Sequence, residues 1–400
     1  MRKTPPPVSG LSLGFVSALL LFPLTASARD SLTLPTPTSD ERTEYIRRAR
    51  VWEPTDVASK DLYNGPEGRL QFAVDQETPC DFVPQPLGGF TAKFLCRLED
   101  GTIVKVKYQE GDQYKEEFGE VLGTRLFWAL GFHADRMLPV RVVCRGCPRH
   151  PWKYLDARKH SPLDEQGLMR PLPPEAEVGT YTFDPAAIEE TLDVEPIQER
   201  EHQGWSWKSL KLVDQNLGGA SKAESDALRL LNAFVQNADN KGKQNALACP
   251  RNELVEDDDG RVTCRRPILY VDDLGSVFGK GGFTTGYAGR VDYAGWEERP
   301  VWRNRGSCRA RLAAIGGIWR RSTLRDPVIG EEGRALLSRQ LEQLSDAQIT
   351  DLFRAARIER LHQTISDGAS GRRDVTLEDW VVLFKKKRAE ITTHPGCPTP

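Results

Sequence analysis

Alternating hydrophobic and polar positions between residues 80 and 145 predict a small sheet with one helix. Segments 91–98 and 102–108 alternate like strands, and the turn Glu99-Asp100-Gly101 between them predicts a hairpin. Hydrophobic residues then recur with helical spacing over 115–130, where Gly131 ends the pattern. Segment 139–144 has the pattern of a further strand.

The second half of the chain has mostly helical periodicity. Ser221-x-x-Glu224 is a capping box that predicts a helix running towards Asp239, and 267–271 reads as a buried strand. Further helices are expected at the end of the chain, at 331–344, 345–358 and 376–391. Segment 146–204 is rich in proline and charge, so a linker or irregular insert is expected there. These elements together predict an α+β fold, with a small β-rich part followed by a larger, mainly helical part.

Composition excludes several classes of protein. The 400 residues carry 55 Lys+Arg against 57 Asp+Glu, so we expect no specific nucleic-acid binding, which usually requires a basic excess. The hydrophobic content of 39% argues against a chain that is disordered throughout.

The N-terminus has the pattern of an export signal. Basic residues Arg2 and Lys3 precede an apolar stretch at 11–24 and an Ala-Ser-Ala site ending at Ala28. We therefore expect a signal peptide at 1–28 and a periplasmic or extracellular protein without a transmembrane helix after cleavage. An N-terminal anchor helix is the alternative. Residues 29–65, rich in Pro, Thr, Ser and charge, predict a flexible N-terminal arm with one short helix around 39–51.

Cysteine usage agrees with export. All eight cysteines follow residue 28, and an even number in an exported chain favours disulfides. Cys249 and Cys264 flank a predicted hairpin and are the first pair expected. Cys144-x-x-Cys147 is ambiguous, because with Cys249 and Cys264 it would also supply four thiolates for zinc.

The first half contains residues suited to phosphate binding. Gly88 and Gly89 precede a strand, as in a loop that covers phosphates, although two glycines there also make an ordinary turn. Lys105 and Lys107 lie on one face of the next predicted strand. Glu120 lies in the following helix, from which it would reach one of these lysines; solvent-facing lysines and glutamate are the alternative.

The second half contains residues suited to phosphoryl transfer, which needs an aspartate near the attacking hydroxyl and oxygen ligands for magnesium. Asp239 would orient the hydroxyl or take its proton, and Lys241 would stabilise the transferred charge. Asp273 and Asn245 would hold the metal, with Gln244 as the other amide for this role. A polar loop followed by a β-turn is the alternative.

With these residues the chain resembles the protein-kinase-like fold, above all its divergent HipA-like and phosphatidylinositol-kinase-like branch. It is also similar to a set of exported bacterial proteins that share its Asp-Asn-Lys and Asp-Leu-Gly segments and the Cys-x-Gly-Cys-Pro at 144–148. The resemblance implies two lobes, a β-rich N-lobe at 66–145 and a helical C-lobe at 205–395. It also implies Mg²⁺ and ATP, or another nucleotide, with phosphoryl or nucleotidyl transfer to an unknown acceptor, a protein or a small molecule.

A catalytically inactive binding module with the same fold is the alternative function. It would act through its cleft or through segment 299–325, which holds eight arginines and no acidic residue. Arginine with interspersed tryptophan suits acidic or phosphate-rich partners. A solvated segment with inward-packed tryptophans is the other interpretation of this pattern.

Overall fold

The structure is a computed structural model whose described part begins after the N-terminal segment. It describes residues 32–89, 91–109, 115–160, 177–199, 204–280, 291–312, 324–366 and 371–398, with a few isolated positions besides. The predicted signal peptide, 1–28, lies outside the described residues apart from Met1.

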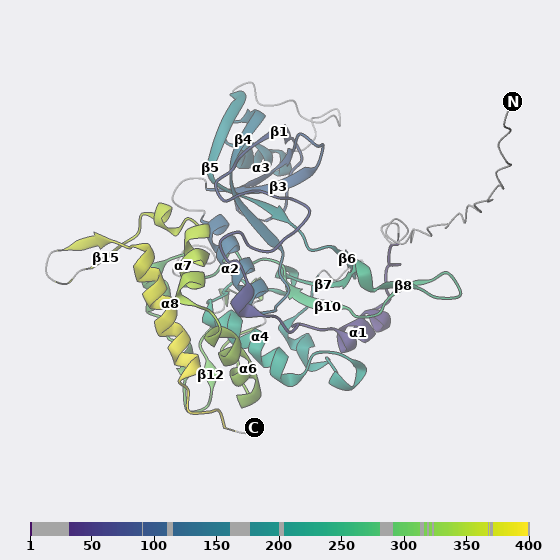
Figure 1. Ribbon diagram of the computed structural model, residues 1–400, viewed down its shortest axis with the longest axis vertical. Helices are drawn as coiled ribbons and strands as arrows, with labels where there is room; N and C mark the ends of the chain where they lie inside the picture. Colours follow the sequence, from purple (N-terminus) through teal and green to yellow (C-terminus); the bar gives the residue numbers. More distant parts are fainter. Residues whose placement is uncertain are drawn as a thin grey trace.

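A closed five-stranded barrel lies at one end of the molecule (Figure 1). Its strands are, in spatial order, β1 (Glu77–Val83), β2 (Lys93–Arg97), β3 (Ile103–Tyr108), β5 (Val178–Glu190) and β4 (Arg136–Pro148). Neighbouring strands are antiparallel except β1 and β4, which run parallel and close the barrel. Alternate positions fill the interior, among them Phe94, Val106, Leu138 and Ile188. The predicted hairpin of β2 and β3 is confirmed.

The expectation of an irregular segment at 146–204 is wrong for β5. This strand lies between β3 and β4 and completes the barrel, and α3 (Pro151–His160) precedes it. Its first half alternates weakly, whereas Asp184–Glu190 includes Pro185 followed by Ala-Ala, where burial is nearly continuous. A strand that is half-exposed in its first part and buried in its second part shows neither steady alternation of polar and apolar residues nor one continuous apolar run.

The expectation of a flexible arm at 29–65 is wrong for its described part, residues 32–65. The predicted short helix forms as α1 (Ser39–Arg48), with a capping box between Thr38 and Glu41. Ile46, Val57 and Leu62 are buried in the main hydrophobic core. This segment therefore belongs to the folded body of the protein.

The other end of the molecule is mainly helical, as expected. α4 (Lys222–Phe234), α7 (Asp346–Ala355) and α8 (Leu377–Thr392) begin at capping boxes, and α6 (Glu331–Glu342) packs between α4 and α8. A small antiparallel sheet of β10 (Ile268–Val271), β7 (Asn245–Pro250) and β6 (Val194–Pro196) lies beside them. In the described part of the chain, no helix combines the length and apolar character needed to cross a membrane.

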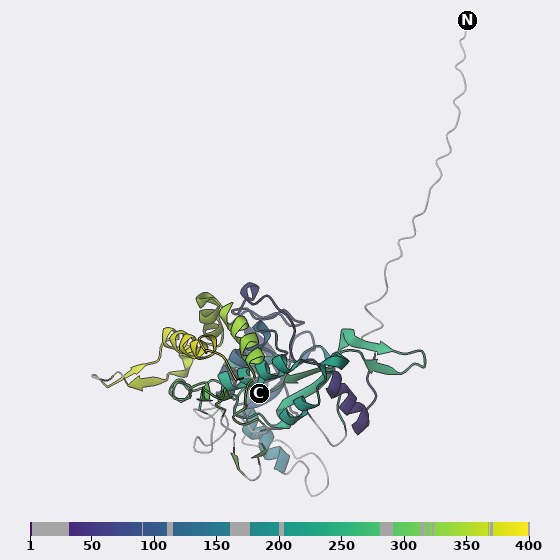
Figure 2. The ribbon, with the colours of Figure 1, turned by 90° about the horizontal axis from the view of Figure 1, so that it is seen from below.

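Shorter elements complete the described chain. Hairpins β8–β9 and β15–β16 project from opposite sides in both views (Figures 1 and 2). The bounds are β8 (Leu254–Glu256), β9 (Val262–Cys264), α5 (Tyr293–Glu297), β11 (Trp302–Asn304), β12 (Arg309–Ala310), β13 (Gly316–Gly317), β14 (Arg320–Arg321), β15 (Thr364–Ser366) and β16 (Arg372–Asp374). The 3₁₀ turns are η2 (Val57–Ser59), η4 (Trp207–Lys211), η5 (Gln215–Leu217), η6 (Gly242–Gln244), η7 (Arg251–Glu253) and η9 (Ile358–Leu361).

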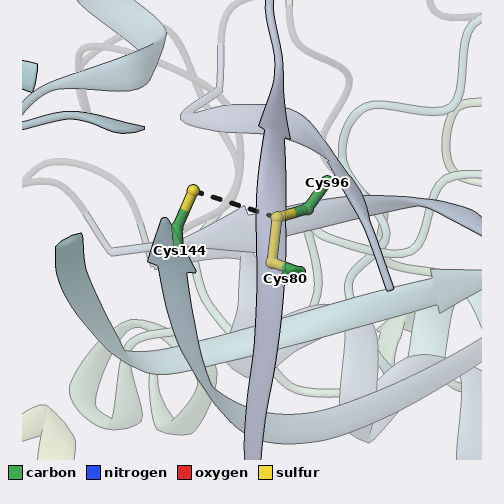
Figure 3. Close-up of side chains that lie close together, drawn as sticks. All are labelled: Cys80, Cys96 and Cys144. Atoms are coloured by element: carbon green, nitrogen blue, oxygen red, sulfur yellow. Dashed lines mark hydrogen bonds between the residues drawn. A yellow bond between two sulfur atoms is a disulfide. The ribbon is translucent and has the colours of Figure 1, made fainter. Parts of the chain in front are cut away.

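All eight cysteines form disulfides: Cys80–Cys96, Cys144–Cys147, Cys249–Cys264 and Cys308–Cys397. The predicted pair across the β8–β9 hairpin is thus confirmed. The zinc alternative is wrong, because Cys144 is bonded to Cys147 in the barrel, whereas Cys249 of β7 is bonded to Cys264 of β9. Within the barrel, the Sγ atoms of Cys96 and Cys144 lie 3.8 Å apart (Figure 3), so two disulfides pack together there.

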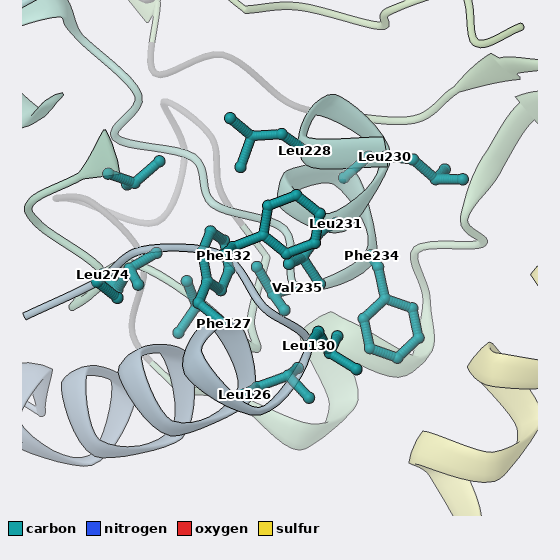
Figure 4. Packing of buried hydrophobic residues seen from close by; sticks show 14 of the residues in the cluster. Leu126, Phe127, Leu130, Phe132, Leu228, Leu230, Leu231, Phe234, Val235 and Leu274 are labelled. Carbon is teal, nitrogen blue, oxygen red and sulfur yellow. The ribbon is translucent and has the colours of Figure 1, made fainter. Parts of the chain in front are cut away.

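Helix α2 (Glu116–Ala129) connects the barrel to the helical end. It contacts β3, β4 and β5 on one side and α7 on another, and nearly all of its residues are buried. Its last turn and the residues after it, Leu126, Phe127, Leu130 and Phe132, pack with the α4 side chains Leu231 and Phe234 and with Leu274 (Figure 4). A helix buried on several sides fixes the position of both ends of the molecule.

Two glycines let α2 approach the segment after β10 closely. A Cβ on Gly119 would lie 2.4 Å from the carbonyl oxygen of Gly275, and one on Gly123 would lie 2.7 Å from the Cβ of Leu274. The backbone that follows Asp273 therefore lies directly against this helix.

We expect Gly119→Ala to lower the free energy of unfolding by about 1–3 kcal/mol, the usual cost of overpacking. The added methyl group meets backbone atoms, which cannot rotate away. Urea denaturation measures the effect. Gly88→Ala is the control, since a Cβ there meets no atom within 4 Å. Equal stability of the Gly119 variant and the parent protein would contradict this close packing.

Candidate functional site

The lysines of β3 face α2 on the outside of the barrel. Val104 and Val106 point into the barrel core, so Lys105 and Lys107 share the opposite face. Lys107 Nζ donates to Glu120 Oε1 of α2, and both side chains are buried. Of the two predicted lysines, Lys107 is thus the one that meets Glu120.

A second carboxylate joins the two lysines. Glu189, at the end of β5, forms an ion pair with Lys105, and its other oxygen lies 3.4 Å from Lys107 Nζ. Burial lowers the pKa of Lys107, but Glu120 and Glu189 outweigh burial and hold it well above its usual value. Lys107 therefore carries a positive charge in the folded protein.

The glycine turn lies beside a third lysine. Lys93 on β2 is the register partner of Lys107, and a Cβ on Gly89 would lie 2.6 Å from Lys93 Nζ. Gly89 has φ +94°, a conformation that glycine adopts without strain, while Gly88 faces open space. Burial, and next the charge of Lys107, lower the pKa of Lys93 to about 8. The predicted loop therefore lies next to the lysines of the sheet.

The loop after α4 contacts the loop after β10 through Gln244. Its Nε2 donates to Asp273 Oδ2 at 2.7 Å and to Asp239 Oδ2 at 3.4 Å. Its carbonyl oxygen accepts the amides of Asp272 and Asp273 at 3.0 and 3.3 Å. Lys241 Nζ lies 2.6 and 2.9 Å from the two oxygens of Asp239. The predicted residues Asp239, Lys241, Gln244 and Asp273 are therefore brought together.

Asn245 has a different environment from Gln244. It begins β7, opposite Val271, and its Nδ2 donates to the carbonyl oxygen of Trp205 at 2.9 Å. Its Oδ1 is buried and accepts no hydrogen bond from the part of the chain that the structure describes. Of the two candidate amides, Gln244 is the one between the aspartates.

Three carboxyl groups form a possible metal site. One oxygen from each of Glu116, Glu120 and Asp273 lies within 4.8 Å of the others. Oxygen ligands of this kind suit Mg²⁺, so the residues present fit the ion that the sequence implies. Asp273 is held further by the amide of Gly275, which donates to its Oδ1 at 3.2 Å.

Crowding changes the acidity of these groups. Burial, and next the charge of Asp273, raise the pKa of Glu116 to about 7. Burial also raises the pKa of Glu120, but its ion pair with Lys107 opposes this shift and keeps Glu120 paired as a carboxylate. Burial raises the pKa of Asp273 too, but Lys107 and the Gly275 amide outweigh it and the net shift is downward. Asp273 therefore stays ionised at neutral pH.

Sequence reasoning did not assign Lys93, Glu116 or Glu189 to the site. Glu116 precedes Glu120 by four residues, so helical spacing places both on one face. Lys93 shares its strand face with Lys107 only once the hairpin register is known. Glu189 lies on β5, which the sequence pattern did not reveal.

Several arginine side chains described in segment 299–325 bind other parts of the protein, while the backbone of Leu324 in this segment bonds to Asn240. Trp302 is buried and donates to the carbonyl oxygen of Glu390, Arg303 pairs with Asp326, and Arg305 donates to the carbonyl oxygen of Thr393. Trp319 lies outside the described residues. Several of these arginines thus bind the protein itself, which fits the solvated-segment interpretation for that part.

Comparisons with known proteins assign no family. No family model matches the chain, and no curated protein matches it. Among solved structures, the Helicobacter pylori proinflammatory kinase CtkA aligns with a TM-score of 0.40 and 8% identity over 80% of this chain and 97% of that one.

Two structures of the Golgi casein kinase also align. The one with Mn/ADP bound has a TM-score of 0.31 and 10% identity over 80% of this chain and 73% of that one. The other has a TM-score of 0.31 and 8% identity over 94% and 93%. Similarity this low leaves the family of this chain unassigned.

Magnesium binding should strengthen as pH rises from 6 to 8. A proton on Glu116 competes with the metal below pH 7, given its pKa of about 7. We expect a larger Mg²⁺-induced rise in melting temperature at pH 8 than at pH 6, measured by scanning fluorimetry. Glu116→Gln should reduce this pH dependence, and Glu256→Gln, at an exposed position, should preserve it. Equal shifts at both pH values in the parent protein would contradict the assignment.

Without metal, the same group should make stability fall with pH. Its pKa rises from 4.5 to about 7 on folding, so the folded state binds more protons than the unfolded state between these values. The contribution of Glu116 to stability is therefore fully present below pH 4.5 and lost as pH rises through 7. Urea denaturation at pH 5 and pH 8, with Glu116→Gln as comparison, measures it.

Proposed function

We propose that this chain is a kinase-like phosphotransferase that binds a magnesium-nucleotide and transfers a phosphoryl, or nucleotidyl, group to a hydroxyl. The carrying observation is the convergence of separate segments on one site: Lys107 of β3 on Glu120 of α2, and Asp239 and Asp273 on Gln244. These segments lie far apart in the sequence. Chance therefore does not explain why all of their functional residues come together in one place.

Each residue has a role that its surroundings support. Lys107, held by Glu120, would bind phosphate oxygens. Lys93, which lies beside Lys107 and next to the glycine turn, would assist it. Asp273 and Glu116 would hold Mg²⁺, and Gln244 would orient Asp273. A bound Mg²⁺ would neutralise phosphate charge. Asp239 would accept the proton of the acceptor hydroxyl, and Lys241 would leave Asp239 to bind the transferred group.

The arrangement of elements supports the two-lobed interpretation. The barrel carries the lysines, the helical end carries the aspartates, and α2 contacts both. In this proposal the barrel is the N-lobe, and residues 205–395 form the C-lobe. The strand β5, missed in the sequence, belongs to the N-lobe, so this lobe extends beyond residue 145.

An exported location is part of the proposal. The four disulfides support it, because such bonds persist mainly outside the reducing cytosol. The nucleotide donor would then be one available in the periplasm or outside the cell.

An inactive binding module is the second candidate. The observation that favours it is the pair between Asp239 and Lys241, which occupies both carboxylate oxygens. A carboxylate neutralised in this way is a poor proton acceptor unless the lysine moves.

Magnesium-dependent nucleotide binding is the first test. A ligand that binds only the folded state stabilises it by about 2.7 kcal/mol at one hundred times Kd. We expect ATP to raise the melting temperature only with Mg²⁺, and Asp273→Asn to remove the effect. Asp258→Asn, on the exposed β8–β9 turn, is the control. No shift at millimolar ATP with a folded protein would refute the nucleotide site.

Catalysis is tested separately from binding. Asp239→Asn should keep the magnesium-dependent ATP shift but slow transfer by roughly 10²–10⁴-fold, the usual contribution of a general base. Nucleotide consumption measures the rate, and the intact mass of the product distinguishes phosphoryl from nucleotidyl transfer. If the parent protein binds ATP but its turnover equals that of Asp239→Asn, the inactive-module alternative is correct.

A further inference from the structure

A large pocket lies in the helical end of the molecule. Its volume is about 1130 Å³. One wall is η4 with the residues that follow it, a second is the first half of α4, and a third is segment 324–328. None of the residues assigned above to nucleotide or metal binding lines it.

The pocket is strongly basic. Acidic side chains contribute only Asp214 and Asp326 to its lining. The cationic ones are Arg47, Lys208, Lys211, Lys222, Arg229, Arg309 and Arg325. Because the whole chain has a formal net charge of −2, this positive charge is concentrated here and attracts anions.

Three of these seven cations are available to a ligand. Lys222 and Arg229 already bind Asp226, Arg47 already binds Glu44, and Arg309 donates to the carbonyl oxygen of Asp326. The exposed side chains of Lys208, Lys211 and Arg325 make no hydrogen bond or ion pair with any described residue. A ligand carboxylate would therefore form ion pairs with these three side chains without breaking an ion pair inside the protein.

Exposed hydrophobic side chains lie among the cations. Leu212 is 48% exposed and Val328 is 55% exposed, and both line the pocket. Inorganic polyphosphate or a sulfated glycan would gain nothing from burying them. A polypeptide that combines acidic and hydrophobic residues would use both kinds of group.

The pocket is connected directly to the proposed catalytic loop. Leu324, in its wall, donates its amide to Asn240 Oδ1 at 3.0 Å, and Asn240 Nδ2 donates to the Leu324 carbonyl oxygen at 3.1 Å. Asn240 lies between Asp239 and Lys241 in the chain. A segment bound beside Arg325 would therefore lie next to the loop that carries the proton acceptor.

We propose that this pocket binds an acidic polypeptide segment of the acceptor and places a neighbouring hydroxyl near Asp239. The inference rests on the proposed function, since it names the acceptor class of that same site: a protein with carboxylate-rich sequence and at least one hydrophobic residue beside the target hydroxyl.

Fluorescence anisotropy with a labelled Glu-rich peptide, containing one Ser and one Leu, tests binding without any turnover. We expect the full chain to bind it more tightly than a peptide with Gln in place of Glu. Lys208→Glu/Arg325→Glu should weaken binding about tenfold, because two attractions become repulsions. Arg97→Glu/Arg339→Glu, at exposed positions outside the pocket, is the control for charge reversal.

The hydrophobic contribution separates a peptide from other anions. Leu212→Ser/Val328→Ser should weaken peptide binding but leave the affinity for inorganic polyphosphate unchanged. Equal binding of the Gln peptide, or no effect of the pocket charge reversal, would overturn the proposal. If polyphosphate outcompetes the peptide and the Ser variants bind the peptide normally, the pocket is an anion site, which would also overturn it.

The magnesium-dependent ATP shift, measured on the same samples, separates the two failures. Retained ATP binding without a preference for acidic peptide would refute this inference alone. Peptide binding that requires Lys208 and Arg325, in a protein that binds no nucleotide, would refute phosphoryl transfer and leave the pocket as a docking surface for acidic protein segments.

Discussion

The buried ion pair between Lys107 and Glu120 is the constraint on which the site depends. Neither charge is tolerated alone in this interior, because an unpaired buried charge costs several kcal/mol. The pair therefore requires α2 to lie against β3. Gly119 and Gly123, on the same helix, then allow the backbone after Asp273 to contact α2 directly. One interaction thus places an element of the barrel, a helix and the acidic segment after β10 at a single point.

This arrangement concentrates more negative than positive charge in little space. Lys93, Lys105 and Lys107 face four carboxyl groups, those of Glu116, Glu120, Glu189 and Asp273. The protein relieves the excess by keeping a proton on Glu116, whose pKa is raised by burial and next by the charge of Asp273. A divalent cation would relieve it in another way, by replacing that proton. The same crowding of carboxyl groups that is unfavourable by itself therefore favours metal binding.

Much of this arrangement was predictable from the sequence, and the exceptions have clear physical causes. The hairpin, α2, α4 and the disulfide at Cys249 have local signals: alternation, helical spacing, a capping box and a flanked turn. The choice between Gln244 and Asn245 has none, since it depends on where β7 begins. Successive residues of a strand point to opposite sides, so a shift of one residue in the pairing register of β7 would exchange the two amides. Glu189 was hidden for a related reason, because a strand buried along only half its length has no single period.

The basic pocket was not predictable from the sequence either, because the pocket depends on the folded positions of residues far apart in the chain. A formal charge of −2 argues against a general binder of nucleic acids, yet it says nothing of where the charges lie. Here the acidic groups gather at the junction of β3, α2 and β10, whereas cations that pair with none of the described residues gather between η4 and segment 324–328. Asn240, bonded to Leu324 and adjacent to Asp239, joins the two regions. Since opposite potentials on either side of one loop attract different ligands, a metal-bound donor would bind on one side of it and an acidic acceptor on the other. The loop between the two ligands would carry Asp239, the proposed proton acceptor.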